Sequence, residues 1–239
     1  MAGLTALVTG ANSGIGMETA RQFAAAGHTV YVGSRDVERG RHAVEEIGGD
    51  SRLLVIDVTD AMSVAGAAAQ VPDLDVLVNN AGIMVDGNVA PHADVDSFRR
   101  TYETNVFGVL AVINAFLPAL RRSAHPRIVN VSSGTGSLGW STGPNPQFDY
   151  QTGGTGAAYR SSKTALNALT VSYAQALDSE GFKVNTLAPG LRATNLNARA
   201  AASGGDPAQA AAGAVRLGLL PDDGPTGAFF SWDGTSVPW

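Results

Sequence analysis

Short apolar runs alternate with longer amphipathic segments along most of the chain. The apolar runs are bounded by turn-forming residues and cover 4–8, 29–33, 53–56, 76–78, 127–131 and 184–187. The segments between them span ten residues or more, and their apolar positions recur with the period of a helix. This alternation predicts βαβ units and therefore the α/β class, with a parallel sheet that helices cover on both faces.

Two segments depart from this rhythm. Residues 137–156 are rich in Gly, Ser, Thr, Pro and Asn, which predicts a long inserted loop. Residues 192–214 are rich in alanine but contain Gly204, Gly205 and Pro207, which predicts a mobile helix–loop lid over a substrate. Long loops in compact domains often carry function, although either segment could instead be a solvated surface excursion.

The composition narrows the classes of function. The chain has 239 residues, of which 44% are hydrophobic, and this favours one domain, 1–239, with a substantial core. Its formal net charge of −5 offers no general attraction for nucleic acid or anionic lipid, so neither partner is expected. The longest apolar stretch, 106–120, contains Asn114 and Pro118 and is too short for a typical membrane span. We expect it to form a buried helix.

Cysteine and histidine usage excludes further chemistries. The sequence has no cysteine, so disulfides and thiolate metal sites are excluded and redox chemistry is left to a diffusible cofactor. No metal site is predicted, because no pair of histidines has metal-ligand spacing. The first residues lead directly into an apolar run without a signal-peptide pattern, which favours a cytoplasmic protein. The histidines, all expected at the surface, are His28, His42, His92 and His125.

A glycine-rich turn follows the first predicted strand and opens a helical pattern. Its spacing is Gly10-x-x-x-Gly14-x-Gly16. Glycines permit a tight turn and a close approach of the backbone to a pyrophosphate, whose charge the amides at a helix N-terminus favour. Any tight strand-to-helix turn could use such glycines, but the position directly after the first strand favours dinucleotide binding.

The end of the second predicted strand bears on the choice between NADPH and NADH. An arginine there attracts the 2′-phosphate of NADPH, whereas a carboxylate repels it and accepts hydrogen bonds from the ribose. Arg35 therefore favours NADPH. The neighbouring Asp36 could be read as the NAD marker, but we interpret it as the cap of a helix that begins near Val37.

Tyr159 and Lys163 are four residues apart at the start of a segment with helical spacing of apolar residues. Residues at this spacing lie on one face of a helix, so Lys163 can sit beneath Tyr159. A nearby ammonium lowers the pKa of a tyrosine from about 10 and makes it a usable acid or base. The pair alone is weak, because tyrosine and lysine at this spacing more often serve packing and solvation.

The motifs together resemble those of the short-chain dehydrogenase/reductase family, in the same order and over essentially the whole chain. The similarity is closest to NADPH-linked carbonyl reductases, on the basis of residues 33–37 and of 224–230 through to Trp239. The motifs that carry the resemblance are residues 9–16, Asn79-Asn80-Ala81-Gly82, Asn105, Ser132-Ser133, the pair Tyr159 and Lys163, and Pro189-Gly190.

The resemblance implies a single-domain Rossmann-like doubly wound sheet of about seven parallel strands, and a catalytic tetrad. Ser133 would hydrogen-bond the substrate oxygen, Tyr159 would donate its proton, and Lys163 would also hold the nicotinamide ribose. Asn105 would support a water that links Lys163 to a proton relay. Successive strand residues face opposite ways, so only one of the two serines should enter the site, and Ser133 matches the family's position.

The resemblance also implies a set of cofactor contacts. Asp57 and Val58 would lie by the adenine, Asn80 and Ala81 beside the adenosine, and Thr194 at the nicotinamide carboxamide. Alternatively, Asp57 and Asn80 could cap strand ends and Thr194 could cap the lid helix. The full expected set is Gly10, Asn12, Ser13, Gly14, Ile15, Gly16, Ser34, Arg35, Asp57, Val58, Asn80, Ala81, Gly82, Tyr159, Lys163, Pro189, Gly190 and Thr194.

The sequence departs from the family pattern at two points. Ser133 and Tyr159 are 26 positions apart instead of about a dozen, and the 137–156 loop fills the difference. Its Trp140, Phe148 and Tyr150 suit a substrate wall, in which we expect Trp140 to contact substrate along with Ser133 and Tyr159, or could block an oligomer interface. Ser13 stands where several NADPH-dependent relatives have a basic residue, so Arg35 must supply most of the discrimination.

The sequence predicts a cytoplasmic NADPH-dependent enzyme that reduces a ketone or aldehyde. The same residues could oxidise a secondary alcohol, and a protein that binds NADPH without turnover is a third reading. Tyr159 and Lys163 are both present, which favours an enzyme over such a sensor. The expected partner is a small-molecule carbonyl or alcohol, and the choice between monomer and homo-oligomer stays open.

Overall fold

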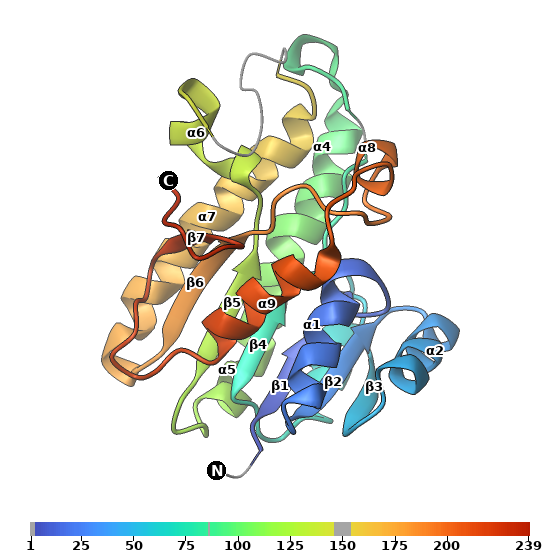
Figure 1. Cartoon of the computed structure of the whole chain (residues 1–239), viewed down its shortest axis with the longest axis vertical. Helices are drawn as coiled ribbons and strands as arrows, with labels where there is room; N and C mark the ends of the chain where they lie inside the picture. The colour runs from blue at the N-terminus through green and yellow to red at the C-terminus, as the bar shows by residue number, and fades with distance from the viewer. Residues whose placement is uncertain (1–2, 86, 146–153) are drawn as a thin grey trace.

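The computed structural model describes residues 3–85, 87–145 and 154–239. Within these residues seven parallel strands form one sheet, in the order β3-β2-β1-β4-β5-β6-β7 (Figure 1). The strands are β1 (Thr5–Val8), β2 (Thr29–Ser34), β3 (Ser51–Val55), β4 (Val76–Asn79), β5 (Arg127–Val131), β6 (Lys183–Ala188) and β7 (Phe229–Ser231).

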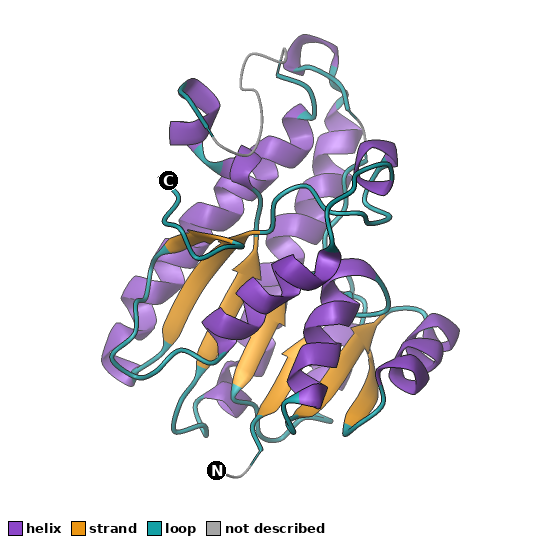
Figure 2. Cartoon of the chain, viewed as in Figure 1, coloured by secondary structure: helices purple, strands orange, loops and turns teal. Residues whose placement is uncertain are grey.

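Helices connect the strands and cover both faces of the sheet (Figure 2). The α-helices are α1 (Gly14–Ala25), α2 (Val37–Ile47), α3 (Ala61–Ala68), α4 (Val95–Tyr102), α5 (Val109–Leu120), α6 (Leu138–Thr142), α7 (Ala157–Leu177), α8 (Ala198–Ala201) and α9 (Pro207–Gly218). Short 3₁₀ turns occur at Ala90–His92, Gly134–Gly136 and Asp178–Glu180, and a π-helical turn at Glu103–Gly108 joins α4 to α5.

Alternate residues of each central strand enter different cores, because successive side chains point to opposite faces of a sheet. In β1, Leu7 packs with α3, α5 and α7, whereas Ala6 and Val8 pack with α1, α2 and α9. All three side chains are fully buried. A sheet buried on both faces explains why its strands read as continuous apolar runs.

The strand order reverses between β1 and β4. The chain runs outward from β1 to β2 and β3, and then returns to β4 on the other side of β1 before continuing to β7. The connections therefore diverge at the carboxyl ends of β1 and β4, which is where open parallel sheets bind ligands.

The predicted strands are confirmed, with ends that differ by at most two residues. The lid prediction over 192–214 is wrong in its second half. From Pro207 the chain forms α9, whose Ala210, Ala211 and Ala214 are fully buried, and α9 packs against α1 as part of the core. The predicted 137–156 loop contains the short helix α6, and its residues 146–153 lie outside the described part of the chain.

The helical run Val95–Leu120 is, by length and composition, the one described helix that could cross a membrane. Its Val112, Ile113 and Phe116 are fully buried in the core on one face of the sheet. The prediction of a buried helix at 106–120 is confirmed for these positions.

Candidate active site

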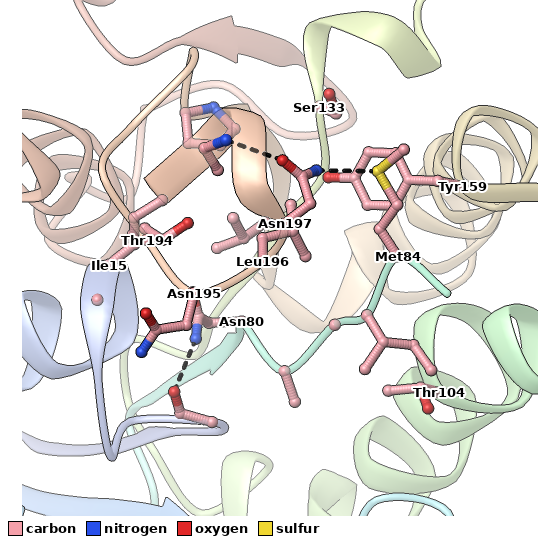
Figure 3. Close-up of a pocket in the computed structure, with 18 of the residues that line it drawn as sticks. Ile15, Asn80, Met84, Thr104, Ser133, Tyr159, Thr194, Asn195, Leu196 and Asn197 are labelled. Atoms are coloured by element: carbon pink, nitrogen blue, oxygen red, sulfur yellow. Dashed lines mark hydrogen bonds between the residues drawn. The ribbon is translucent and has the colours of Figure 1, made fainter. Parts of the chain in front are cut away.

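A cavity of about 730 Å³ lies at the carboxyl ends of the strands. Residues from the β1–α1 turn, from the ends of β2 to β5, from the start of α7 and from the segment after β6 all line it (Figure 3). It brings together seventeen of the predicted site residues: Gly10, Asn12, Ser13, Gly14, Ile15, Arg35, Asp57, Val58, Asn80, Ala81, Gly82, Ser133, Tyr159, Lys163, Pro189, Gly190 and Thr194.

The glycine-rich turn requires its glycines at each predicted position. Gly10 and Gly14 have φ of 62° and 55°, in the left-handed region that favours glycine. A Cβ on Gly16 would clash with the Asn80 side chain and the Gly10 carbonyl oxygen. Gly16 is buried and does not line the cavity, so its part in the site is to let α1 pack close to the turn.

The turn is fixed to β4 by hydrogen bonds. Asn80 Nδ2 donates to the carbonyl oxygens of Thr9 and Gly10 at 3.0 and 3.1 Å. The amides of Asn80 and Ala81 donate to Thr9 Oγ1 at 3.0 and 3.1 Å. Asn80 therefore positions the glycine-rich turn as well as lining the cavity.

The N-terminus of α1 faces the cavity with open amides. Its N-cap, Ser13, makes no side-chain cap hydrogen bond within the described residues, and Gly14 and Ile15 line the cavity. A Cβ on Gly14 would come within 3.1 Å of Thr194 Cγ2, so any larger residue would narrow the space there. Unpaired amides and the positive end of the helix dipole suit a phosphate.

Arg35 and Asp57 line the cavity where it borders the ends of β2 and β3. Arg35 is exposed, and its charge is one of the influences that lower the pKa of Asp57. Burial raises the pKa of the Asp57 carboxyl, but hydrogen bonds from Thr59 and the attraction of Arg35 outweigh that effect. Asp57 Oδ1 accepts from the amide and hydroxyl of Thr59 at 2.9 and 2.7 Å, so it both caps the turn after β3 and borders the cavity.

The interpretation of Asp36 as a helix cap is confirmed. Its carboxylate accepts from the Arg39 amide at 3.0 Å at the start of α2 and pairs with Arg39 Nε at 2.9 Å. Ser34, predicted to contact the cofactor, is buried and lies outside the cavity lining. The Ser34 hydroxyl donates to the Asp36 carbonyl at 2.8 Å, which makes it part of the β2–α2 turn.

Ser133, Tyr159 and Lys163 meet on one wall of the cavity. Lys163 Nζ lies 5.7 Å from the centre of the Tyr159 ring, as the four-residue spacing on α7 predicts, and donates to the Val131 carbonyl oxygen at 2.8 Å. The Ser133 hydroxyl also acts on the Tyr159 phenol, where it lowers the pKa. Ser133 Oγ also lies 2.9 Å from Thr135 Oγ1 and accepts from the Thr135 amide at 3.2 Å.

The prediction that the Tyr159 pKa lies below its ordinary value is wrong, because the net shift is upward. Burial raises the pKa of the Tyr159 phenol to about 12, and the influence of the Ser133 hydroxyl offsets only part of that rise. Burial also lowers the pKa of Lys163 to about 8. Desolvation penalises both charged forms, so Tyr159 is a protonated phenol at neutral pH while Lys163 still carries its charge.

Asn105 lies in the π-helical turn and is fully buried. Its side chain accepts from the Ile83 amide at 2.9 Å and donates to the Ile83 carbonyl and to Ser162 Oγ at 2.9 and 3.0 Å. It does not line the cavity, although a Cβ on Gly82 would lie 3.3 Å from Asn105 Oδ1 and 3.4 Å from Lys163 Nζ. The side chain therefore ties the end of β4 to α7, and the water relay stays a prediction.

The segment between β6 and α9 crosses the cavity. Thr194 lines it beside the α1 turn and does not cap α8, because the N-cap of α8 is Asn197, which accepts from the Ala200 amide at 2.8 Å. Asn197 Nδ2 donates to Met84 Sδ at 3.0 Å, a contact that Figure 3 marks with a dashed line. This contact joins the segment to the chain after β4.

The predicted role of Trp140 in a substrate wall is wrong. Trp140 is buried with Ala188, Phe229 and Val237 in a small core of its own and does not line the cavity. The Ser137 hydroxyl, which accepts from the Trp140 amide, donates to the Pro238 carbonyl and so holds α6 to the C-terminal residues. Phe148 and Tyr150 lie outside the described residues.

Sequence reasoning missed several residues that border the cavity. They share no spacing or motif, and most lie in irregular segments whose path the sequence pattern does not define. The main ones are Ile83, Met84, Thr104, Thr135, Arg160, Arg192, Asn195, Leu196 and Asn197.

Comparisons with known proteins agree with this geometry. A family model described as short chain dehydrogenase matches residues 4–203. The chain is 36% identical over 246 residues to the short-chain dehydrogenase anuI of Penicillium roqueforti (strain FM164), with 95% of this chain and 96% of that protein covered. It is 32% identical over 293 residues to salutaridine reductase of Papaver bracteatum, with 94% and 93% covered.

Solved structures show the same architecture. The NADPH-bound carbonyl reductase from chicken fatty liver matches with a TM-score of 0.86 and 26% identity, covering 100% of both chains. The salutaridine reductase of Papaver somniferum matches with a TM-score of 0.80 and 29% identity, covering 95% of this chain and 99% of the other.

The chain belongs to the short-chain dehydrogenase/reductase family, and its seven-stranded parallel sheet is the Rossmann-like fold of that family. It is an oxidoreductase that acts on carbonyl or alcohol groups of a small molecule, with a nicotinamide dinucleotide as the redox partner of the family.

Proposed function

We propose that the protein reduces a ketone or aldehyde to an alcohol with NADPH, and that Tyr159 donates the proton. The observation that carries this proposal is the convergence of Ser133, Tyr159 and Lys163 on one wall of a cavity. The same cavity is lined by Arg35 at the end of β2. Ser133 and Tyr159, which would contact the substrate oxygen, and Arg35, which would select the cofactor, thus border one continuous space.

The residues of the cavity fit a nicotinamide dinucleotide. The open amides of Gly14 and Ile15 suit the diphosphate, and the exposed guanidinium of Arg35 suits a 2′-phosphate. Gly82, where a Cβ would lie 3.4 Å from Lys163 Nζ, leaves space beside the ammonium for a ribose. When bound, a reduced nicotinamide supplies a hydride to the carbonyl carbon.

The chain's own residues handle the oxygen and the proton. Ser133 Oγ donates a hydrogen bond to the carbonyl oxygen and orients it toward Tyr159. As the π bond of the carbonyl breaks, the Tyr159 hydroxyl gives its proton to that oxygen, which forms the alcohol O–H and leaves a phenolate. The charged Lys163 stabilises this phenolate, so the charge that develops in the transition state has a nearby partner.

The first test is Tyr159→Phe, which removes the proton donor and keeps the ring. We expect kcat for carbonyl reduction to fall by about 10²- to 10⁴-fold, the usual contribution of a general acid, while the Kd for NADPH stays within about threefold. Tyr173→Phe is the matched control, because Tyr173 lies on the same helix and its hydroxyl donates to Asn114 away from the cavity. A Tyr159→Phe enzyme that keeps most of its activity would disprove the role.

The second test addresses the cofactor. Wild-type protein should bind NADPH more tightly than NADH, and Arg35→Gln should weaken NADPH binding by about 10- to 150-fold while changing NADH binding little, because one charged hydrogen-bonding group is lost. Arg39→Gln removes a nearby arginine that is already paired with Asp36 and serves as the control. Fluorescence titrations measure both constants, and equal or tighter NADH binding by the wild type would overturn the assignment.

A further inference from the structure

Arg192 is a buried arginine at the base of the segment that crosses the cavity. Only 8% of its surface is exposed, and it borders the cavity. Its guanidinium carbon lies 4.3 Å from the centre of the Trp232 ring, which stacks against it from the end of β7. The position combines a full positive charge with almost no contact with solvent.

The guanidinium is short of hydrogen-bond acceptors. Within residues 3–85, 87–145 and 154–239, its Nε and Nη2 are buried without a partner. Nη1 donates only a long bond of 3.4 Å to the neighbouring Leu191 carbonyl. Burial lowers the pKa of Arg192, and the attraction of Asp206 compensates in part. Buried charges are ordinarily paired and fully hydrogen-bonded, so this arrangement is costly as it stands.

The surroundings hold the guanidinium in place without satisfying it. The Ala193 amide donates to the Gly205 carbonyl at 2.8 Å, which closes the segment on itself next to Arg192. Gly190 and Gly205 make room, since a Cβ on either would lie within 3.5 Å of an Arg192 nitrogen. The Asp206 carboxylate accepts from the Ala208 amide at 2.9 Å as the cap of α9, so it is engaged in another interaction.

We propose that Arg192 binds an anionic oxygen group, a phosphate or a carboxylate, that enters the cavity. A planar guanidinium held against an aromatic ring presents two parallel N–H groups, and this geometry matches two oxygens of such an anion. Thr194, two residues further on, lies against Gly14 at the N-terminus of α1, so Arg192 and the helix amides serve the same cavity.

The anion has two candidate sources, and the inference rests on the proposed function for both. One is the diphosphate of the dinucleotide. The other is an acidic group on the carbonyl substrate, which would make the enzyme selective for keto or aldehyde acids. A role confined to bracing Trp232 is the competing explanation, and it predicts the same anion affinity with and without the Arg192 guanidinium.

The first experiment needs no turnover. Thermal unfolding of wild type, Arg192→Met and Arg216→Gln is followed against inorganic pyrophosphate at constant ionic strength. Met keeps an unbranched apolar stem but is shorter than arginine and carries no charge. Arg216 is exposed and donates to the Trp232 carbonyl at 3.2 Å outside the cavity, so Arg216→Gln is the matched control.

We expect pyrophosphate to stabilise the wild type and Arg216→Gln alike, with an apparent Kd about tenfold weaker in Arg192→Met. Arg192→Lys should fall between them, because lysine keeps the charge and loses the planar fork. If Arg192→Met does not fold, the comparison of Arg192→Lys with the wild type replaces it. Equal pyrophosphate affinity in all variants overturns the proposal and leaves a bracing role.

The second experiment identifies the source of the anion. A rise in the Kd for NADPH in Arg192→Met assigns the cofactor diphosphate. A rise in KM for a keto acid, with KM for its neutral ester unchanged, assigns an acidic substrate. A variant that matches the wild type in both measurements contradicts the proposal. A wild type that reduces no carbonyl contradicts the proposed function instead, and the pyrophosphate titration still tests Arg192.

Discussion

At the scale of single residues, the cavity sets the protonation states of Tyr159 and Lys163 by desolvating both. The pKa of Tyr159 near 12 keeps its proton available for donation across the physiological range. The pKa of Lys163 near 8 places the loss of its charge within reach of ordinary assays. The lysine, and not the tyrosine, is therefore the group whose titration should appear in the pH dependence of reduction.

This assignment predicts a specific pH profile. We expect kcat/KM for carbonyl reduction to be level below about pH 8 and to fall above it, because a neutral Lys163 no longer stabilises the phenolate that Tyr159 becomes. Lys163→Met should lower kcat by at least about 100-fold and lose the descending limb near pH 8. Initial rates from pH 6 to 10 measure both, and a Lys163→Met profile with an unchanged limb would assign that limb to another group.

At the scale of elements, the β1–α1 turn depends on close contacts that only glycine allows. A Cβ on Gly16 would meet the Gly10 carbonyl oxygen and the Asn80 side chain that fixes the turn. We expect Gly16→Ala to destabilise the fold by about 1–3 kcal/mol through overpacking and to weaken NADPH binding, because the amides of α1 move. Urea denaturation and a fluorescence titration measure the two effects.

Gly66→Ala is the control for that substitution. Gly66 lies within α3, and a Cβ there would meet open space. The change should be neutral or stabilise by about 0.5–1 kcal/mol, because alanine is the better helix former. If Gly16→Ala behaved in the same way as Gly66→Ala, the close packing of the turn would have no energetic importance.

The same scale shows which elements the sequence predicts and which it does not. Buried strands such as β1 and β5 are continuous apolar runs, so their periodicity identifies them. β7 has three residues, too few for a pattern, and its existence followed only from the family resemblance. α9 was mistaken for a lid because its buried residues, apart from Leu217, are all alanine or glycine. Small residues allow close packing on α1 but leave no strong apolar signal.

The residues of the candidate site also fall into those that the sequence predicts and those that it does not. The glycine-rich turn and Arg35 follow predicted strands, and the spacing of Tyr159 and Lys163 places them on one helix face. Their convergence with Ser133 on one cavity was predicted only through the family resemblance. Trp140 was assigned to the cavity from its residue type, whereas the path of α6 turns it into a separate core. Arg192 was not singled out, because its burial depends on Trp232, forty positions away in an unrelated segment.

At the scale of the whole molecule, the buried charge of Lys163 in the site lowers the stability of the fold. Lys163 is 4% exposed, and its folded-state pKa of about 8 lies below the ordinary value of 10.5. Below pH 8 both the folded and unfolded states hold the proton, so the folded state bears the full cost of the buried charge. Between about pH 8 and 10.5 the unfolded chain binds more protons, so this cost is relieved and stability rises with pH.

Because the buried charge of Lys163 is costly, we expect Lys163→Met, which removes activity, to make the protein more stable at pH 7. The shift in pKa corresponds to a cost on the order of 3 kcal/mol, and the loss of the hydrogen bond to the Val131 carbonyl reduces the gain to about 1–3 kcal/mol. The advantage over wild type should shrink as pH rises toward 10. Urea denaturation at pH 7 and 10 measures this difference in stability. Lys183→Met is the control for loss of a lysine, because Lys183 is half-buried at the start of β6. A Lys163→Met protein less stable than wild type at pH 7 would mean that the charge is already compensated in the fold.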